Sequence, residues 1–245
     1  MRVGGVSEGW ADFAVLRNIL KAVLDLDASE VQSIRPELQT DETSAGAPGA
    51  RTFSNWELVR QECEQWAAIE AFLDDALDEA RLVVVHVDTA ECHLPGFGVV
   101  RPDRAAADYV TACHDAVLVA LRGWTAERRS AQLVGAVAVE ETDAWLLAHY
   151  APVRDADTGA LANPKERLQR AFERTNAVSE RDRASILRER STLTRYHRLS
   201  EPLRKPKALR AATAFNASLA RFVARLCDAA EALAPGTCRV RERDT

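Results

Sequence analysis

Segments of strand length alternate with longer amphipathic segments along the first 150 residues of the chain. The pattern of apolar and polar positions predicts strands at 2–7, 30–35, 82–87 and 132–139. The segments between and after them carry apolar residues three and four positions apart, which is the spacing of one helix face. Strands that alternate with helices predict an α/β fold with a parallel sheet flanked by helices.

Start and stop signals refine the predicted helices. Ser54 and Glu57 have the spacing of a capping box, so one long helix is expected from Ser54 to Leu77. Asp103 is expected to cap the helix that carries the next apolar stripe. Residues 37–51 are rich in Thr, Ser, Gly and Pro, which is typical of a loop.

The character of the chain changes after Tyr150. A loop-like stretch ends at Asn163-Pro164, where a basic helix to about Arg174 is expected to begin. Residues 179–200 are polar and rich in arginine, and a final amphipathic helix is predicted at 208–233. We therefore expect an α/β domain at 1–152 and a basic helical C-terminal region at 153–245.

The charge of the chain is divided in the same way. The net charge is −5, but residues 1–164 hold 13 Lys and Arg against 27 Asp and Glu, whereas residues 165–210 hold 14 against 6. This asymmetry favours an acidic body joined to a segment that contacts an anionic partner such as nucleic acid; an Arg-rich helical surface against a partner protein is the alternative. The candidate nucleic-acid-binding residues are Lys165, Arg167, Arg170, Arg188, Arg195 and Arg198.

Acidic side chains follow three of the predicted strands. Glu8 follows the first strand, Asp88 and Glu91 follow the strand at 82–87, and Glu141 and Asp143 follow the strand at 132–139. Open parallel sheets bind ligands at the carboxyl ends of their strands, so these acids would converge if the strands are neighbours. The simpler interpretation of Asp88 is a cap on the next turn.

Clustered carboxylates repel one another unless a cation neutralises them. Hard oxygen ligands select Mg²⁺ or Mn²⁺, and the usual chemistry of such a site is phosphodiester hydrolysis. The sequence therefore leads to the hypothesis of a metal-dependent nuclease-like protein.

Four motifs resemble those of a known family. The segments SEGWAD (7–12) and VDTAE (87–91) resemble the glutamate and aspartate motifs of TOPRIM domains, the topoisomerase–primase fold. The segment ETDAWLLAH (141–149) and the basic NPKERL (163–168) are more similar to the TOPRIM-like family called domain of unknown function 4276. The resemblance covers most of residues 3–170 and is only generic beyond them.

The resemblance implies a role for each acid. Glu8 would be the general acid/base or a metal contact, Asp88 the principal metal ligand, and Glu141 and Asp143 further acids of the site. The chain departs from the usual Asp-x-Asp, because Ala90 occupies the second position and leaves Glu91 as a substitute. A degenerate site is therefore the second hypothesis: a TOPRIM-like interaction subunit working with a partner ATPase, often in genome defence.

Other classes of site are less well supported. His86, Asp88, Cys92 and His93 suggest a zinc site, but no second ligand pair accompanies them. No nucleophile elbow or Walker A sequence occurs. The five cysteines are widely spaced and odd in number, which indicates reduced thiols. Without a signal-peptide core or an apolar run of 18 residues, we expect a cytoplasmic protein that does not enter the membrane, with a homodimer through the last helix as one arrangement.

Overall fold

Four parallel strands form the central sheet of the computed structural model, which describes residues 1–36, 55–75, 79–153 and 156–240. Their order across the sheet is β2 (Val31–Arg35), β1 (Arg2–Val6), β3 (Arg81–Asp88) and β4 (Leu133–Ala138). Every neighbouring pair is parallel. The prediction of an α/β fold with a parallel sheet is confirmed, and all four predicted strands are present to within a residue or two.

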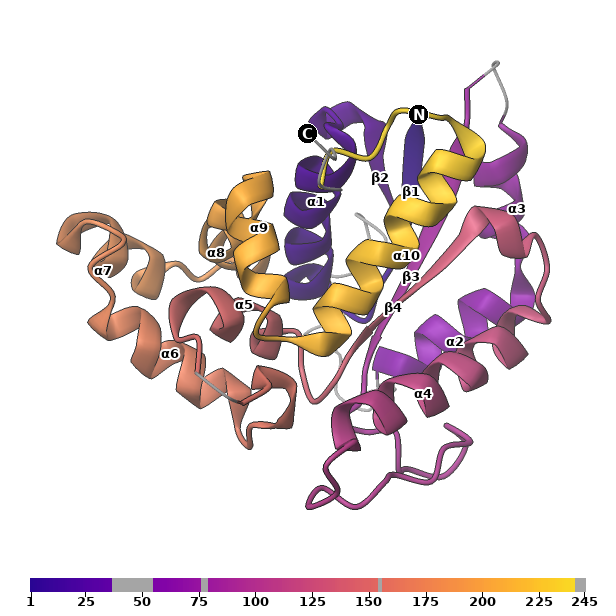
Figure 1. The fold of residues 1–245 in the computed structure, drawn as a ribbon. Coiled ribbons are helices and arrows are strands. Elements are labelled where there is room, and N and C mark those ends of the chain that lie inside the picture. The colour runs from indigo at the N-terminus through magenta and orange to yellow at the C-terminus, as the bar shows by residue number, and fades with distance from the viewer. Residues whose placement is uncertain (37–54, 76–78, 154–155, 241–245) are drawn as a thin grey trace, which may run out of the picture.

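Helices cover both faces of the sheet (Figure 1). Helices α1 (Trp10–Leu24) and α10 (Ala217–Leu233) cover one face, and α2 (Asn55–Gln65), α3 (Ala67–Asp74) and α4 (Tyr109–Thr125) cover the other. Of the remaining helices, α8 (Thr192–Ser200) packs against α1, and α9 (Pro206–Thr213) packs against α10 and α5 (Asp143–Tyr150). Helix α6 (Pro164–Arg174) packs against α5, and α7 (Glu180–Arg188) lies beyond α8, away from the sheet (Figure 1). Short 3₁₀ turns occur at Ala28–Glu30, Ser130–Gln132, Thr158–Ala160 and Glu201–Arg204.

The central strand β3 is buried on both faces, as its β-branched sequence predicts. Leu82 and Val84 pack toward α1 and α10, while Val83, Val85 and Val87 pack toward α2 and α4. All five are fully buried, and each contributes about 1.5–3 kcal/mol through the removal of apolar surface from water. This rigid strand fixes the position of Asp88 at its carboxyl end.

Two glycines in β1 allow helices to approach the sheet closely. A Cβ atom on Gly4 would lie 2.6 Å from the Cδ1 atom of Ile34, and one on Gly5 would lie 2.8 Å from the ring of Phe13. A side chain at either position would therefore push its neighbour away from the sheet. Gly5 keeps α1 close to β1, and with it the turn that carries Glu8, whereas Gly4 gives room to Ile34 of β2 and Phe72 of α3.

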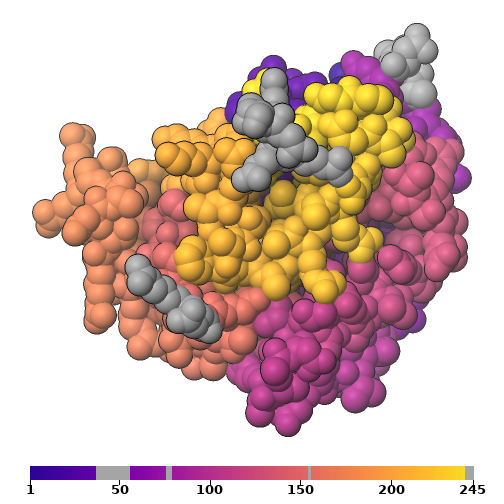
Figure 2. All heavy atoms as spheres, viewed as in Figure 1, coloured from indigo at the N-terminus to yellow at the C-terminus, as the bar shows by residue number. Residues whose placement is uncertain are grey.

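The C-terminal helix α10 is part of the same core as the sheet. Phe222 stacks on Trp145 with 5.5 Å between ring centroids and an interplanar angle of 6°, and the Trp145 Nε1–H donates to the Ser218 Oγ at 2.8 Å. Figure 2 shows the yellow spheres of α10 seated between the segments around them. The division at residue 152 stays a prediction, although residues from both sides of it pack together.

Two helices predicted as continuous are interrupted. Trp66 adopts a left-handed conformation with φ of 66° and separates α2 from α3, and the predicted Ser54 cap lies outside the described residues. The final helix is likewise divided into α9 and α10, where the Asn216 side chain accepts a hydrogen bond from the Leu219 N–H and begins α10. Apolar periodicity continues across both breaks, which is why the pattern did not reveal them.

The predicted cap at Asp103 is wrong. Helix α4 begins at Tyr109, after Asp108, whose side chain makes no capping hydrogen bond. The Asp103 side chain accepts a hydrogen bond from the Ala105 N–H at 3.0 Å, in a turn ahead of the helix. An aspartate stabilises such a turn in the same way as a cap, so its sequence signal does not distinguish the two.

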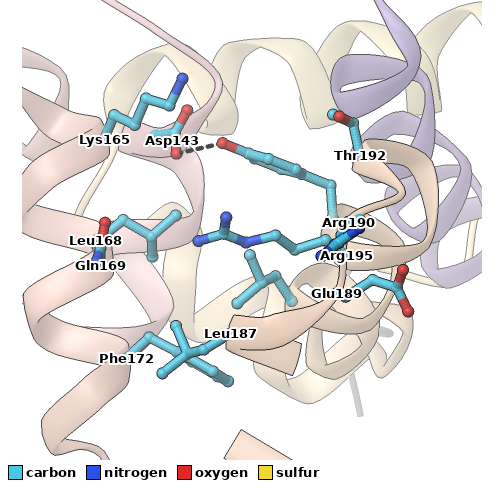
Figure 3. A pocket seen from close by; sticks show the side chains of 12 residues that line it. Asp143, Lys165, Leu168, Gln169, Phe172, Leu187, Glu189, Arg190, Thr192 and Arg195 are labelled. Atoms are coloured by element: carbon cyan, nitrogen blue, oxygen red, sulfur yellow. Dashed lines mark hydrogen bonds between the residues drawn. The ribbon is translucent and has the colours of Figure 1, made fainter. Parts of the chain in front are cut away.

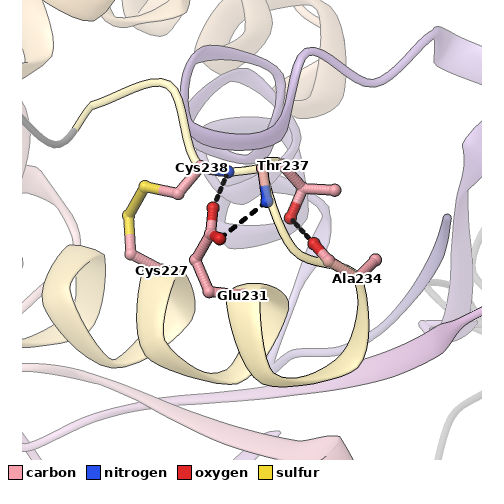
Figure 4. The surroundings of a disulfide bond; sticks show 6 residues. Cys227, Glu231, Ala234, Thr237 and Cys238 are labelled. Carbon is pink, nitrogen blue, oxygen red and sulfur yellow. Dashed lines mark hydrogen bonds between the residues drawn. A yellow bond between two sulfur atoms is a disulfide. The ribbon is translucent and has the colours of Figure 1, made fainter. Parts of the chain in front are cut away.

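The expectation of reduced thiols is wrong for two of the five cysteines. Cys227 of α10 and Cys238 form a disulfide, while Cys63, Cys92 and Cys113 are free and buried. Figure 4 shows the turn that brings the pair together: the Glu231 carboxylate accepts hydrogen bonds from the Gly236 and Cys238 N–H groups, each at 2.7 Å. Spacing along the sequence could not reveal a pair made by this turn.

None of the helices within the described residues combines the length and apolarity needed to cross a lipid bilayer.

We predict that Phe222→Ala lowers the free energy of unfolding by about 3–5 kcal/mol, because it removes the ring stacked on Trp145 and leaves a cavity between α10 and the sheet. Val119→Ala is the matched control, since Val119 is 66% exposed on α4 and its truncation should change stability by less than about 0.5 kcal/mol. Urea denaturation measures both. A loss below about 1 kcal/mol at Phe222 would show that α10 contributes little to the core.

Candidate functional site

The ends of the two central strands are joined through Glu8 and Asp88. Glu8 follows β1 and Asp88 ends β3, and the Asp88 N–H donates a hydrogen bond to the Glu8 Oε1 at 2.8 Å. The Asp88 Oδ1 in turn accepts a hydrogen bond from the Ala90 N–H at 3.0 Å. The structure thus brings together the two acids to which the sequence assigned catalysis. The strand therefore positions the Asp88 backbone, and the turn after the strand holds its side chain.

Glu141 and Asp143 approach the same place from the end of β4. Asp143 is the first residue of α5, is buried, and accepts a hydrogen bond at 2.9 Å from the hydroxyl of Tyr196 in α8. The Glu141 Oε2 is buried and has no hydrogen-bond partner within the described residues. The negative charge of Glu141 raises the pKa of both Asp88 and Asp143, so the two acids near β4 belong to the cluster.

Asp12 is a member of the cluster that sequence reasoning did not assign. It lies in the first turn of α1, and its Oδ1 accepts a hydrogen bond from the Thr142 hydroxyl at 2.6 Å. Its charge raises the pKa of Glu8, Asp88 and Asp143. The available signal was its place four residues after Glu8, at the start of the helix that follows the strand. We call Glu8, Asp12, Asp88, Glu141 and Asp143 the acid cluster.

The acid cluster is short of positive charge. Burial, followed by the charges of Asp12 and Glu91, raises the pKa of Glu8 to about 8, although the Asp88 N–H bond opposes the shift. Burial and the charge of Glu8 raise the pKa of Asp88 well above its ordinary value. Burial also raises the pKa of Asp143 to about 6, against the Tyr196 hydrogen bond and the charge of Lys165. Desolvation and mutual repulsion thus favour protonated carboxyl groups in the absence of a cation.

Glu91 is placed less favourably than the resemblance implies. It is exposed in the turn that follows β3, and its charge adds to burial in raising the pKa of Glu8. Glu91 is therefore not a buried member of the acid cluster. Glu91 would have to turn inward to reach a cation held by Asp88.

The acid cluster has the donor atoms that a hard divalent cation prefers, but the side chains are not arranged to coordinate one. All of its donors are carboxylate oxygens, and the Glu141 Oε2 is a buried acceptor without a partner. Across residues 1–36, 55–75, 79–153 and 156–240, however, no three His, Cys, Asp or Glu side chains are arranged to hold a metal ion. Glu8 and Asp12 instead accept protein hydrogen bonds.

The zinc candidates are not brought together. His86 is fully buried, contacts Thr142 through its Nε2 at 3.1 Å and presents its ring edge-on to Trp145. Cys92 packs in the hydrophobic core on the opposite face of the sheet, and His93 is exposed. Burial lowers the pKa of His86, so the ring is a neutral core histidine that supports Thr142.

Glu140 is an acid near β4 that is already neutralised. Its carboxylate receives Arg101 and Arg104, each at 2.5 Å, and the Tyr109 hydroxyl. Burial alone would raise the pKa of Glu140, but these hydrogen bonds hold it below its ordinary value. Glu140 therefore fastens the loop after β3 to the end of β4 and does not share the charge deficit of its neighbours.

The six basic candidates do not form one surface. Lys165 and Arg195 line a cavity together with Asp143, whereas Arg167 and Arg170 line a shallower hollow along α6. The Arg188 Nε donates to the Ala184 carbonyl, and the Arg198 Nη1 donates to the Ser185 hydroxyl at 2.9 Å. Only Lys165 and Arg195 are thus placed beside the acid cluster.

Comparisons of the chain with models of known families, with curated proteins and with solved structures find no match.

The raised pKa of Glu8 predicts how stability changes with pH in the absence of divalent metal. Between the ordinary value of 4.5 and about 8, the unfolded chain releases the Glu8 proton more readily than the folded protein. The free energy of unfolding therefore falls as pH rises through this window.

Glu8→Gln keeps an acceptor for the Asp88 N–H but carries no charge. The difference in melting temperature between Glu8→Gln and the wild type should increase by a few degrees in favour of the variant from pH 5 to pH 8. A change of ~1 kcal/mol in the free energy of unfolding shifts the melting temperature of a chain of this size by about 2–4 °C. The melting temperatures of both proteins are measured in a chelator, and a difference between them that stays constant from pH 5 to pH 8 would contradict this prediction.

Proposed function

We propose that the protein is a Mg²⁺- or Mn²⁺-dependent nuclease-like enzyme that acts on phosphodiesters of DNA or RNA. The observation that carries the proposal is the acid cluster, in which carboxylates from four segments interact beside the end of β3, and burial and mutual repulsion raise the pKa of Glu8, Asp88 and Asp143. Buried acids that repel one another destabilise the fold, so a cluster of this kind has a physical reason to bind a cation. The motifs that resemble TOPRIM domains contribute residues to this cluster, which supports the same proposal.

Each acid has a role that its surroundings favour. Asp88 is held by the strand and by its own turn, so it is the principal candidate metal ligand. The unpartnered Oε2 of Glu141 and the carboxylate of Asp143 are further oxygen donors. A bound Mg²⁺ or Mn²⁺ supplies charge neutralisation and polarises a phosphate oxygen.

Glu8 is the candidate general acid/base. Without a cation its pKa is raised by burial to about 8, and a cation bound at Asp88 would lower that pKa toward neutral pH, where a group is most effective at both accepting and donating a proton. Its Oε1 is held by the Asp88 N–H, which fixes the carboxyl group beside the principal ligand. From this position Glu8 would take a proton from the attacking water or give one to the leaving oxygen.

The second candidate function is an interaction subunit that keeps the fold without the chemistry and works with a partner ATPase. It is favoured by the absence of a ready metal-holding arrangement in the described part of the chain and by the exposure of Glu91. Such a subunit would cleave no nucleic acid in any divalent metal, whereas the proposed enzyme would.

The direct test is cleavage of labelled single- and double-stranded DNA and RNA with Mg²⁺, Mn²⁺ or a chelator. Asp88→Asn should reduce metal-dependent cleavage by on the order of 100-fold or more, because even outer-shell partners of a metal contribute 10–100-fold. Asp108→Asn is the matched control: it removes the same charge from an exposed aspartate whose side chain does not cap α4. Equal cleavage by wild type and Asp88→Asn, with both folded by circular dichroism, would refute the role of Asp88.

A further inference from the structure

A cavity of about 190 Å³ lies directly beside the acid cluster, between α6 and α8 (Figure 3). In this view Lys165 and Asp143 lie at one end, Phe172 and Leu187 lie at the other, and Arg190 and Arg195 face α6 across the space. We call it the α6–α8 cavity. Asp143 belongs both to its wall and to the acid cluster, so a ligand in the cavity would be adjacent to the candidate metal ligands.

Three cations of the cavity wall are not engaged in close ion pairs within the described residues. Lys165, Arg190 and Arg195 make no ion pair within 4 Å and no side-chain hydrogen bond with other residues of the described chain, although the charge of Lys165 acts on Asp143 from a longer distance. The Nε of Arg195 is also buried without an acceptor. A buried donor that lacks an acceptor is costly, so an anion in the cavity would remove a penalty as well as add an attraction.

The acids on the wall do not cancel these charges. Figure 3 shows the Glu189 carboxylate directed away from the cavity, and its Oε1 accepts a hydrogen bond from the Ser191 N–H at 2.9 Å. Asp143 is engaged by the Tyr196 hydroxyl at 2.9 Å. The cavity is therefore a space lined by cations that adjoins the acid cluster at Asp143. This arrangement suits a phosphate that is held by the cations with its ester bond directed toward the cluster.

Size and lining restrict the ligand further. Leu168 and Phe172 form an apolar wall and are 3% and 1% exposed. A volume of about 190 Å³ is below the ~300–1,000 Å³ of sites that enclose a drug-sized molecule. A phosphate with part of its sugar fits this description, whereas a strand passing through would need a longer channel.

We propose that the α6–α8 cavity binds the terminal phosphate monoester of a nucleic acid strand, with Arg195 and Lys165 as its principal contacts. The strand would leave the cavity past Asp143, so that the adjoining phosphodiester lies at the acid cluster. This inference rests on the proposed function and restricts it: the protein acts at phosphorylated strand ends.

The test is the affinity of fluorescent oligonucleotides with and without a terminal phosphate, at the 5′ or the 3′ end, measured by anisotropy in a chelator. Wild type should bind one phosphorylated end at least about tenfold more tightly than the hydroxyl-ended strand, the scale of a charge-assisted hydrogen bond. Arg195→Met should remove that preference, and Arg195→Lys should restore part of it. Arg210→Met, an exposed arginine of α9 outside the cavity wall, should keep it.

Equal affinity for both strand ends, no binding of either, or an unchanged preference in Arg195→Met would overturn the inference. If Arg195→Met lowers the melting temperature, Lys165→Met tests the same preference for a phosphorylated end, because Lys165 is exposed and its replacement should not destabilise the fold. Adenosine monophosphate and inorganic phosphate should compete weakly, and a free nucleotide that binds more tightly than the oligonucleotide would overturn the assignment to strand ends. Because binding is measured in a chelator and cleavage with metal, the two proposals can fail separately. A preference for phosphorylated ends without Asp88-dependent cleavage would refute the proposed nuclease activity and leave the phosphate site standing.

Discussion

The mutual repulsion of carboxylates at one edge of the sheet is the constraint on which the rest of the structure depends. Parallel pairing of β1, β3 and β4 brings the ends of these strands together, and the hydrogen bond from the Asp88 N–H to Glu8 joins two of them. The fold accommodates these acids through hydrogen bonds from Thr142 to Asp12 and from Tyr196 to Asp143, and burial raises the pKa of Glu8 and Asp88. A divalent cation would replace this arrangement with direct neutralisation.

Two neighbouring acids in one short segment show how environment decides function. Glu140 receives two arginines and a tyrosine, and its pKa is held low. Glu141, the next residue, has a buried oxygen without a partner and raises the pKa of the acids around it. Glu140 adopts a positive φ of 66°, which turns the chain between the two environments. The first acid is structural, and the second is available for a ligand.

Much of the fold followed from local pattern, since a strand buried on both faces and a parallel crossover leave strong signals in the chain. Glu8 and Asp88 could be paired from the sequence because parallel strands end at the same edge. The break at Trp66 and the Cys227–Cys238 pair could not be predicted, because each depends on turns that apolar periodicity does not record. Asp12 was missed although its place after the first strand was a signal, because its role depends on its contact with Thr142. The same holds for the α6–α8 cavity, whose cations come from separate segments of a region where the periodicity is weak.

The central claim is that the acid cluster holds a divalent cation, and crystals soaked in Mn²⁺ test it most directly through anomalous scattering. The account predicts an anomalous peak within coordination distance of Asp88 and at least one other carboxylate of the cluster, about 2.0–2.2 Å from each oxygen as for hard divalent ions in octahedral sites. Glu8 and Glu141 should move toward it. A map without a peak at the end of β3, or with Mn²⁺ bound only elsewhere, would contradict the account.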